Sequence, residues 1–130
     1  MKQHNYFVYI VTNFNKTVLY TRVTNNLEQR LIEHFTNRNN DTTFAGKYQC
    51  HYLIFFERHQ YIDRAIAREK QIKGWTRKKK EILINEENAE WRFLNENVME
   101  WPPLDPSLRS PLKDGVRIPS DRMTNTKNDR

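Results

Sequence analysis

The pattern of apolar positions in the first 95 residues predicts a small mixed fold. Residues 6–11 and 18–24 are rich in aromatic and β-branched residues, which favours two strands. The polar segment 12–17 between them has the composition of a turn, so an antiparallel hairpin is expected. Residues 52–57 form a continuous apolar and aromatic run, which is typical of a well-buried third strand.

The register of the hairpin decides which side chains meet. Residues two apart in a strand share one face of the sheet, and directly opposed side chains touch. With a symmetric loop, Tyr9 faces Tyr20, and Phe7 faces Arg22. We therefore predict that the two phenols stand side by side on one face. A slip of one residue would separate them.

Helical periodicity follows the hairpin. Asn25, with Glu28 three residues later, has the properties of an N-cap with its reciprocal acceptor. The apolar residues then recur every fourth position and predict one buried helix face, made of Leu27, Leu31 and Phe35. Arg30 and His34 are also four residues apart, so their side chains are expected to share a face.

A second helix is predicted over residues 62–73, and a carboxylate occupies its apolar stripe. The stripe consists of Ile62, Ala65, Ile66 and Ile72, and Glu69 fills the position that completes it. A buried carboxylate costs on the order of several kcal/mol unless it is paired or binds a metal. Two interpretations are open: Glu69 pairs with Arg30 or a lysine at the edge of the stripe, or it binds a functional metal ion.

The order of these elements predicts an α+β domain, β-β-α-β-α-α, with a small antiparallel three-stranded sheet flanked by helices. A length of 130 residues suits one domain. All five prolines lie beyond residue 101, and the C-terminal stretch has almost no periodic apolar pattern. We therefore predict a folded domain over residues 1–95 and a Pro-rich, disordered tail over residues 96–130.

Composition narrows the class of protein. A net charge of +6 suits a polyanionic partner, although solvated surface lysines would give the same charge. The single Cys50 excludes an internal disulfide and any multi-cysteine zinc site. No apolar run approaches the ~18 residues that span a bilayer, and no secretion signal is evident at the N-terminus. We expect a cytoplasmic protein with no membrane contact and no obligate protein partner.

Two tyrosine-bearing strand motifs, an Arg–His helix and a glutamate helix follow one another in a set order. The motifs are Phe7-Val8-Tyr9, Tyr20-Thr21-Arg22, Arg30 with His34, and residues 65–75 around Glu69. This order, from residue 5 to residue 94, resembles the GIY-YIG nuclease family, especially its small single-domain bacterial members. The resemblance implies a metal-dependent endonuclease whose catalytic residues are Tyr9, Tyr20, Arg30, His34 and Glu69.

The resemblance also implies a division of chemical tasks. Glu69 would be the single metal ligand, which suits Mg²⁺ (or Mn²⁺) because Mg²⁺ often uses only one or two protein carboxylates. Arg30 offers planar donors to phosphate oxygens. Tyr9 is expected to take a proton from water; a free phenol has a pKa near ~10, so Arg30, His34 and Tyr20 would have to stabilise its anion. Alternatively, either tyrosine has no catalytic role, packs its ring in the core and keeps its hydroxyl exposed to solvent.

One position departs from the family pattern. The second motif of the family ends in glycine, whereas this chain has Arg22. Arg22 either occupies the place of the substrate and silences the enzyme, or turns outward and adds a phosphate contact. The sequence does not decide between these outcomes.

Basic residues favour a nucleic-acid partner. Residues 64–80 contain eight Lys or Arg side chains and one acidic residue, Glu69, which favours salt-sensitive phosphate binding over a merely solvated surface. We expect DNA rather than RNA, although the sequence cannot separate them, with contacts from Arg22, Lys47, Arg68, Lys73, Arg77 and Lys78. Three functions remain open: an active DNA endonuclease, a catalytically weak or inactive nucleic-acid-binding protein, and an interaction module with a structural Glu69–Arg30 ion pair.

Overall fold

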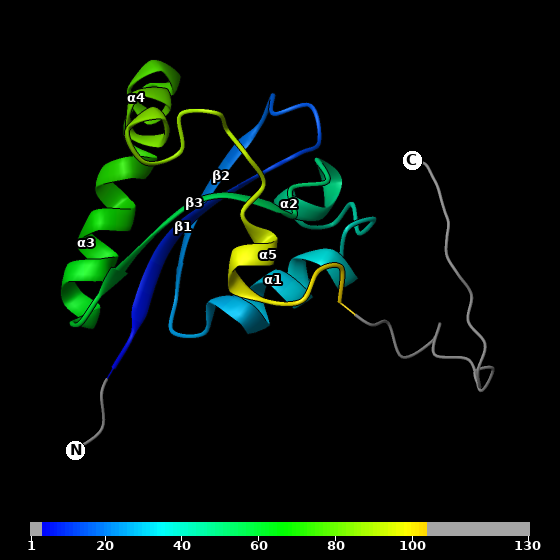
Figure 1. The fold of residues 1–130 in the computed structure, drawn as a ribbon, viewed down its shortest axis with the longest axis horizontal. Coiled ribbons are helices and arrows are strands. Elements are labelled where there is room, and N and C mark those ends of the chain that lie inside the picture. The colour runs from blue at the N-terminus through cyan, green and yellow to red at the C-terminus, as the bar shows by residue number, and fades with distance from the viewer. Residues whose placement is uncertain (1–3, 104–130) are drawn as a thin grey trace.

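The computed structural model describes residues 4–103 and confirms the predicted α+β fold class (Figure 1). Strands β1 (Tyr6–Thr12), β2 (Leu19–Thr24) and β3 (Tyr52–His59) form an antiparallel sheet in the order β2-β1-β3. The helices are α1 (Leu27–Thr36), α2 (Phe44–Lys47), α3 (Ile62–Lys73), α4 (Arg77–Glu87) and α5 (Asn95–Val98). The four-residue helices α2 and α5 are additions to the predicted order. None of the helices within residues 4–103 is long and apolar enough to cross a membrane.

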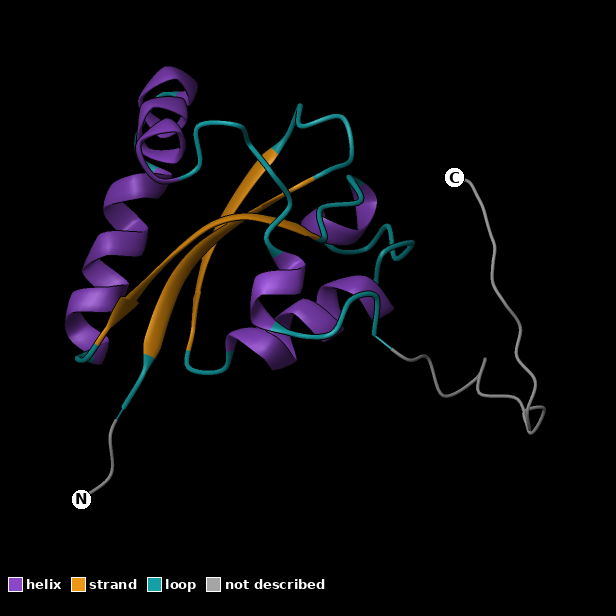
Figure 2. Ribbon diagram, viewed as in Figure 1, coloured by secondary structure: helices purple, strands orange, loops and turns teal. Residues whose placement is uncertain are grey.

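The sheet separates two apolar layers (Figures 1 and 2). Val8 and Ile10 of β1 pack on the side of α3 and α4, with Ala65, Ile72 and Ile84. Tyr9 and Val11 pack on the other side, with Leu27 and Leu31 of α1. Neighbouring residues of β1 therefore serve different layers, as strand geometry requires. The predicted catalytic tyrosines lie on the α1 side.

The hairpin register differs from the prediction by two residues. Tyr9 pairs with Arg22, and Tyr20 pairs with Val11. Asn13 is the reason: its side-chain oxygen accepts hydrogen bonds from the backbone N–H groups of residues 17 and 18, so the turn occupies residues 13–18. A two-residue shift keeps each side chain on its predicted face. Tyr9 and Tyr20 therefore share a face but lie diagonally, and the predicted direct opposition is wrong.

Helix starts and faces follow local chemistry. The N-cap of α1 is Asn26 rather than the predicted Asn25, and its side chain accepts a hydrogen bond of 3.0 Å from the N–H of Gln29. Helix α3 has the predicted bounds, and Glu69 lies on its buried face with Ala65 and Ile72. The predicted stripe was too wide, because two of its members, Ile62 and Ile66, are exposed.

The packed part of the chain extends beyond residue 95. The side chain of Asn95 accepts a hydrogen bond from the N–H of Leu53 (2.8 Å) and donates one to the carbonyl of His51 (3.1 Å). Val98, Met99 and Trp101 then pack on the α1-side layer. Residues 96–101 are therefore part of the fold, although they have no periodic apolar pattern. The rest of the predicted tail, residues 104–130, lies outside the described residues.

Gly46 of α2 is needed for close packing, and we expect Gly46→Ala to destabilise the protein by about 1–3 kcal/mol. A Cβ atom there would lie 2.6 Å from the carbonyl oxygen of Asn37 and closer still to that of Asn40. Gly74→Ala is the matched control, because the nearest atoms to its Cβ, the carbonyl oxygens of Lys70 and Gln71, would lie 3.6 Å away. Urea denaturation should show loss of stability for the first variant only; equal midpoints would contradict the packing argument.

Candidate active site

Three predicted catalytic residues line one pocket. It has a volume of about 210 Å³ and lies between the edge strand β2, helix α1 and the segment that leads into α2. We call it the Tyr20 pocket. Its lining residues are Tyr20, Arg30, Glu33, His34, Asn37, Thr43, Ala45 and Gly46. The ring of Tyr20 meets that of His34 edge-on, with centroids 6.1 Å apart.

Tyr9 lies behind this pocket rather than in its lining. Its side chain is fully buried, and its hydroxyl forms a hydrogen bond of 2.9 Å with Nε2 of His34. A water molecule in the pocket can therefore reach Tyr20 and His34 but not Tyr9. The structure gives no direct access for the predicted transfer of a proton from water to Tyr9. Tyr9 instead contacts the pocket through His34.

Burial and nearby cations set the charge of this pair. Burial raises the pKa of Tyr9, while a hydrogen bond from Arg30 and the charges of Arg30 and Arg22 act to lower it. Burial lowers the pKa of His34 to about 4, and the same two arginines act in the same direction. At neutral pH, Tyr9 is therefore a neutral phenol and His34 a neutral imidazole.

Acid is expected to destabilise the protein between pH 6.5 and 4. Burial lowers the pKa of both His34 and His51 to about 4, from 6.5, so the unfolded chain binds more protons than the folded one in this range. Stability should be unaffected by these groups above pH 6.5 and should fall by up to about 3 kcal/mol per histidine as the pH drops. Urea titrations of the wild type at several pH values should show this fall in the free energy of unfolding. The fall should be smaller in a His34→Gln/His51→Gln variant. An unchanged slope in that variant would assign the acid sensitivity to other groups.

Arg30 separates the Tyr20 pocket from a second pocket. The second pocket has a volume of about 350 Å³, and we call it the Arg22 pocket. Its lining residues are Tyr6, Arg22, Val23, Thr24, Asn25, Arg30, Ile62 and Ile66. Arg22 donates a hydrogen bond of 3.1 Å from Nη1 to the hydroxyl of Tyr20. Because Arg22 lines the second pocket and not the first, it leaves the Tyr20 pocket open.

Glu69 is a buried carboxylate that reaches the site only from the far side of the sheet. Its side chain pairs with Lys73, with 3.1 Å between Oε2 and Nζ, whereas Arg30 pairs with Glu33. The alternative Glu69–Arg30 ion pair is therefore not formed. Within residues 4–103, none of the hydrogen bonds or ion pairs joins Glu69 to the Tyr20 pocket. The connection is indirect: α3 packs on β2 at the sheet edge, and Ile66, one turn before Glu69, lines the Arg22 pocket.

The carboxylate of Glu69 is a type of ligand that a hard cation such as Mg²⁺ prefers. No group of three or more His, Cys, Asp or Glu residues that could hold a metal occurs in the described part of the chain. A site here would therefore depend on one carboxylate and on water or phosphate oxygens, which Mg²⁺ accepts. The chemistry of these oxygens fits the predicted ion.

Sequence comparison decides the family. The model of the GIY-YIG catalytic domain matches residues 5–82. This chain belongs to the GIY-YIG family. It is 30% identical over 98 residues to a UPF0213 protein of Bacillus pumilus (strain SAFR-032), covering 75% of this chain and 96% of that protein. The solution NMR structure of a UPF0213 protein from Bacillus halodurans is 22% identical, with a TM-score of 0.45, over 74% of this chain and 97% of that chain.

Membership of the GIY-YIG family indicates a nuclease-type activity and an interaction with nucleic acid. The matched range includes all five predicted catalytic residues. The geometry brings Tyr20, Arg30 and His34 into one pocket, places Tyr9 behind His34 and leaves Glu69 on α3, on the other side of the sheet.

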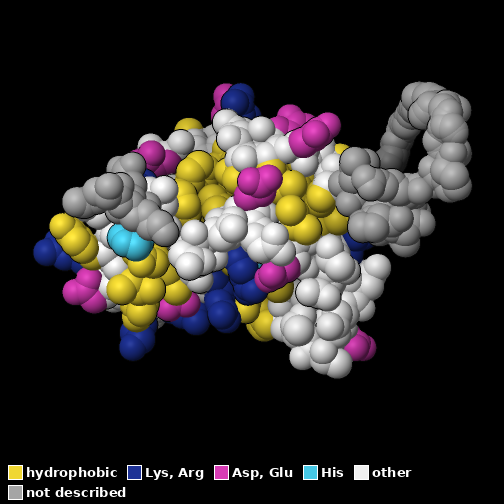
Figure 3. Space-filling model, turned by 90° about the horizontal axis from the view of Figure 1, so that it is seen from below, with side chains coloured by type: hydrophobic (Ala, Val, Ile, Leu, Met, Phe, Trp, Pro, Cys, Tyr) yellow, Lys and Arg dark blue, Asp and Glu magenta, His cyan; other side chains and the backbone are white. Residues whose placement is uncertain are grey.

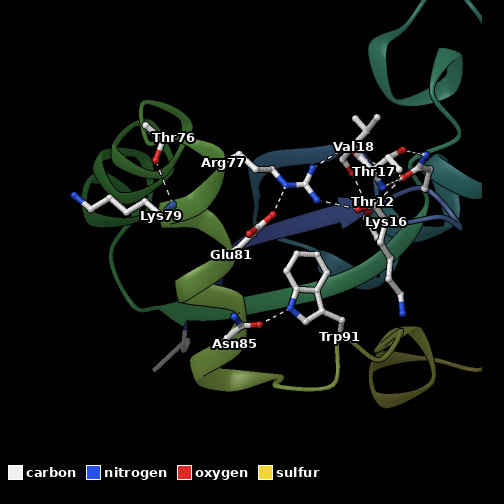
Figure 4. Close-up of polar contacts among 11 residues, drawn as sticks. Thr12, Lys16, Thr17, Val18, Thr76, Arg77, Lys79, Glu81, Asn85 and Trp91 are labelled. Atoms are coloured by element: carbon white, nitrogen blue, oxygen red, sulfur yellow. Dashed lines mark hydrogen bonds and ion pairs between the residues drawn. The ribbon is translucent and has the colours of Figure 1, made fainter.

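The predicted nucleic-acid contacts of this GIY-YIG protein fall into two groups. Arg77 holds the β1–β2 turn against α4: it donates to the carbonyls of Thr17 (2.7 Å) and Lys16 (2.9 Å) and pairs with Glu81 (Figure 4). Arg68 is likewise engaged, since its guanidinium contacts the carboxylate of Glu57, the amide oxygen of residue 71 and the ring of residue 75. These two guanidinium groups already stabilise the fold.

The other predicted contacts are more accessible. Lys47 and Lys78 are exposed, and Lys73 is half-exposed but paired with Glu69. The Nζ atom of Lys47 lies 5.5 Å from the ring centre of Tyr48, at the rim of the segment that lines the Tyr20 pocket. Of these three lysines, Lys47 is therefore the best placed to contact a nucleic-acid strand that enters the Tyr20 pocket.

Sequence reasoning missed the wall of the Tyr20 pocket formed by residues 37–46. Thr43 caps α2 by accepting a hydrogen bond of 3.0 Å from the N–H of Gly46, and the exposed ring of Phe44 stacks on Tyr20 at 5.2 Å. The threonine three residues before the glycine is a recognisable N-cap signal. It could have predicted a helix start, but not that this helix closes the pocket.

Proposed function

We propose that this GIY-YIG protein is a metal-dependent endonuclease that hydrolyses phosphodiester bonds in DNA. The observation that carries the proposal is the convergence of Tyr20, Arg30 and a neutral His34 on one open pocket in a chain of this family. A phenol, a guanidinium and an imidazole supply the donors and acceptors that phosphodiester hydrolysis requires.

Arg30 and Glu69 would bind the scissile phosphate and stabilise the charge that develops on it. The planar guanidinium of Arg30 would bind two oxygens of the scissile phosphate. Glu69 would hold Mg²⁺ or Mn²⁺, and the bound ion would stabilise charge on the transferring phosphate and on the leaving oxygen. Lys73 now neutralises the Glu69 carboxylate, and since its side chain is half-exposed it is free to move away.

Tyr20 would position the attacking water. It is the phenol that lines the pocket, and its oxygen already accepts a hydrogen bond from Arg22. One O–H and one lone pair of the Tyr20 hydroxyl then remain for water. Tyr9 would act through His34, by fixing the orientation of the imidazole through their hydrogen bond. Tyr9 is thus a positioning residue.

We expect Tyr20→Phe to lower the cleavage rate more than Tyr9→Phe does. Loss of the Tyr20 hydroxyl should cost about a hundredfold, at the lower end of what a positioned acid or base contributes. Loss of the Tyr9 hydroxyl should cost about tenfold in rate and about 1 kcal/mol in stability, because it leaves a buried nitrogen of His34 unpaired. Single-turnover cleavage and urea denaturation measure both quantities. A larger loss of cleavage rate in Tyr9→Phe than in Tyr20→Phe would assign the direct contact with the attacking water to Tyr9.

The basic test of the proposal is a nicking assay with purified protein. Supercoiled plasmid and branched DNA are incubated with Mg²⁺, with Mn²⁺ and with a chelator. Nicked product that requires the divalent ion supports the proposal. DNA binding without product under any divalent ion would instead favour a catalytically weak binding protein, which Arg22 in the motif and the Glu69–Lys73 pair make the second candidate. Absence of salt-sensitive binding to any nucleic acid would reject both.

A further inference from the structure

The Arg22 pocket has the charge of an anion site. Two guanidinium groups, from Arg22 and Arg30, line it, and the described residues of its lining include no carboxylate. The Tyr20 pocket differs in this respect, because Glu33 lines it beside Arg30. Arg30 also pairs with Glu33 of the Tyr20 pocket, whereas Arg22 forms no ion pair within residues 4–103, so Arg22 carries the charge that favours binding of an anion here.

Arg22 has hydrogen-bond donors to spare. Of its five N–H groups, one is used on the hydroxyl of Tyr20. Its Nε atom is buried and has no hydrogen-bond partner within residues 4–103. A buried donor without a partner is costly, so a small turn of the guanidinium toward an anion would be favoured. Nε and the free Nη atom form the planar pair that binds phosphate oxygens in a bidentate manner.

Apolar side chains form the opposite wall of this pocket. Ile62 and Ile66 from α3 line it and are 50% and 37% exposed. Figure 3 shows one face of the molecule on which hydrophobic patches and Lys or Arg side chains lie next to one another. An apolar wall displaces water and strengthens the attraction between a guanidinium and a phosphate. The pocket thus combines two cations with partial shielding from solvent.

We propose that the Arg22 pocket is a subsite for the phosphate next to the scissile phosphate on the same strand, with Arg22 as its ligand. Arg30 lines both pockets, so a strand with one phosphate in the Tyr20 pocket would pass Arg30 and bring its neighbouring phosphate to Arg22. This inference rests on the proposed endonuclease function. Arg22, which replaces the family's glycine, then contacts the substrate and does not occupy its place.

The test is a scan of single neutral methylphosphonates along a cleavable DNA oligonucleotide. Binding of each oligonucleotide to the wild type and to the Arg22→Gln variant is measured without metal. Glutamine removes the charge at position 22 but keeps a side chain that a β-strand accommodates. A methylphosphonate next to the mapped cleavage site should weaken wild-type binding about tenfold, the effect of one charge-assisted hydrogen bond. The same substitution should have little effect on binding to Arg22→Gln. Arg22→Gln should also lower the slope of log affinity against log salt by about 0.7–0.9.

Controls separate this inference from the proposed function. Arg92→Gln, at an exposed arginine that pairs within residues 4–103 only with Glu90, should leave the methylphosphonate profile and the salt slope unchanged. Inorganic phosphate should compete only weakly with DNA, and to the same extent for the wild type and for Arg22→Gln. Stronger competition in the wild type would show a site for free anions and would overturn the proposed subsite for a DNA phosphate. Cleavage with identical methylphosphonate profiles for the wild type and Arg22→Gln would overturn the subsite and leave the endonuclease standing. No cleavage and no binding would overturn both.

Discussion

Replacement of Glu69 by glutamine is expected to lower the rate of metal-dependent cleavage by about a thousandfold or more. Glutamine has almost the same shape but no negative charge, so it is a poor ligand for Mg²⁺. A thousandfold loss corresponds to about 4 kcal/mol of transition-state stabilisation, which is within the several kcal/mol that a bound metal supplies. Single-turnover cleavage at saturating Mg²⁺ measures the rate.

Binding and stability should change little in the Glu69→Gln variant. The Glu69–Lys73 pair is an i,i+4 contact with a half-exposed lysine, and such pairs contribute only about 0.3–0.5 kcal/mol. Glu81→Gln is the matched control, because it removes an i,i+4 partner of Arg77 on α4 without touching either pocket. That variant should cleave at the wild-type rate. If Glu69→Gln keeps more than about a tenth of the wild-type rate, Glu69 is not the metal ligand.

Replacement of Arg30 by lysine is expected to lower cleavage several hundredfold, on the order of 10²–10³. Arg30 lines both pockets, and lysine keeps the charge but loses the planar pair of donors that would bind phosphate oxygens. A side-chain contact of the Arg30 guanidinium also acts to lower the pKa of Tyr9, against the effect of burial. Loss of both contacts should affect the rate constant of the chemical step more than DNA affinity, and single-turnover assays over a range of protein concentration separate the two.

Arg38→Lys, just beyond the C-terminal end of α1, provides the matched control. The Arg38 guanidinium donates a hydrogen bond to the carbonyl of Phe35 and lies 3.9 Å from the centre of its ring, outside both pocket linings. This variant should cleave like the wild type. Equal losses in Arg30→Lys and Arg38→Lys would mean that general charge or helix stability, rather than phosphate positioning, explains the effect.

Periodicity predicted the parts of the fold that depend on local patterns. The bounds of α3 and the buried position of Glu69 followed from the spacing of apolar residues. The hairpin register did not, because one side chain, Asn13, fixes the turn by hydrogen bonds that composition does not reveal. Nor did the packing of residues 98–101 beyond the predicted boundary, which Asn95 anchors by a hydrogen bond to Leu53, 42 residues earlier in the chain. Such long-range polar contacts leave no periodic trace in a sequence.

The site was predictable at the level of residue types but not of access. The sequence motifs identified Tyr9 and Tyr20 as a pair, yet only packing of α1 and α2 on the sheet buries one and exposes the other to the pocket. Charge counts had a similar limit. They placed Arg68 and Arg77 among the DNA contacts, whereas the guanidinium groups of both are engaged within the fold.

The most direct test of the proposed site asks whether one metal ion serves Glu69 and the Tyr20 pocket together. Paramagnetic Mn²⁺ is titrated into isotope-labelled protein, and the broadening of NMR signals near the ion is measured residue by residue. We predict that signals of Glu69, Tyr20 and Arg30 broaden together and that Glu69→Gln abolishes this broadening. Broadening confined to other acidic residues, with Tyr20 and Arg30 unaffected, would contradict a metal-dependent active site at this position.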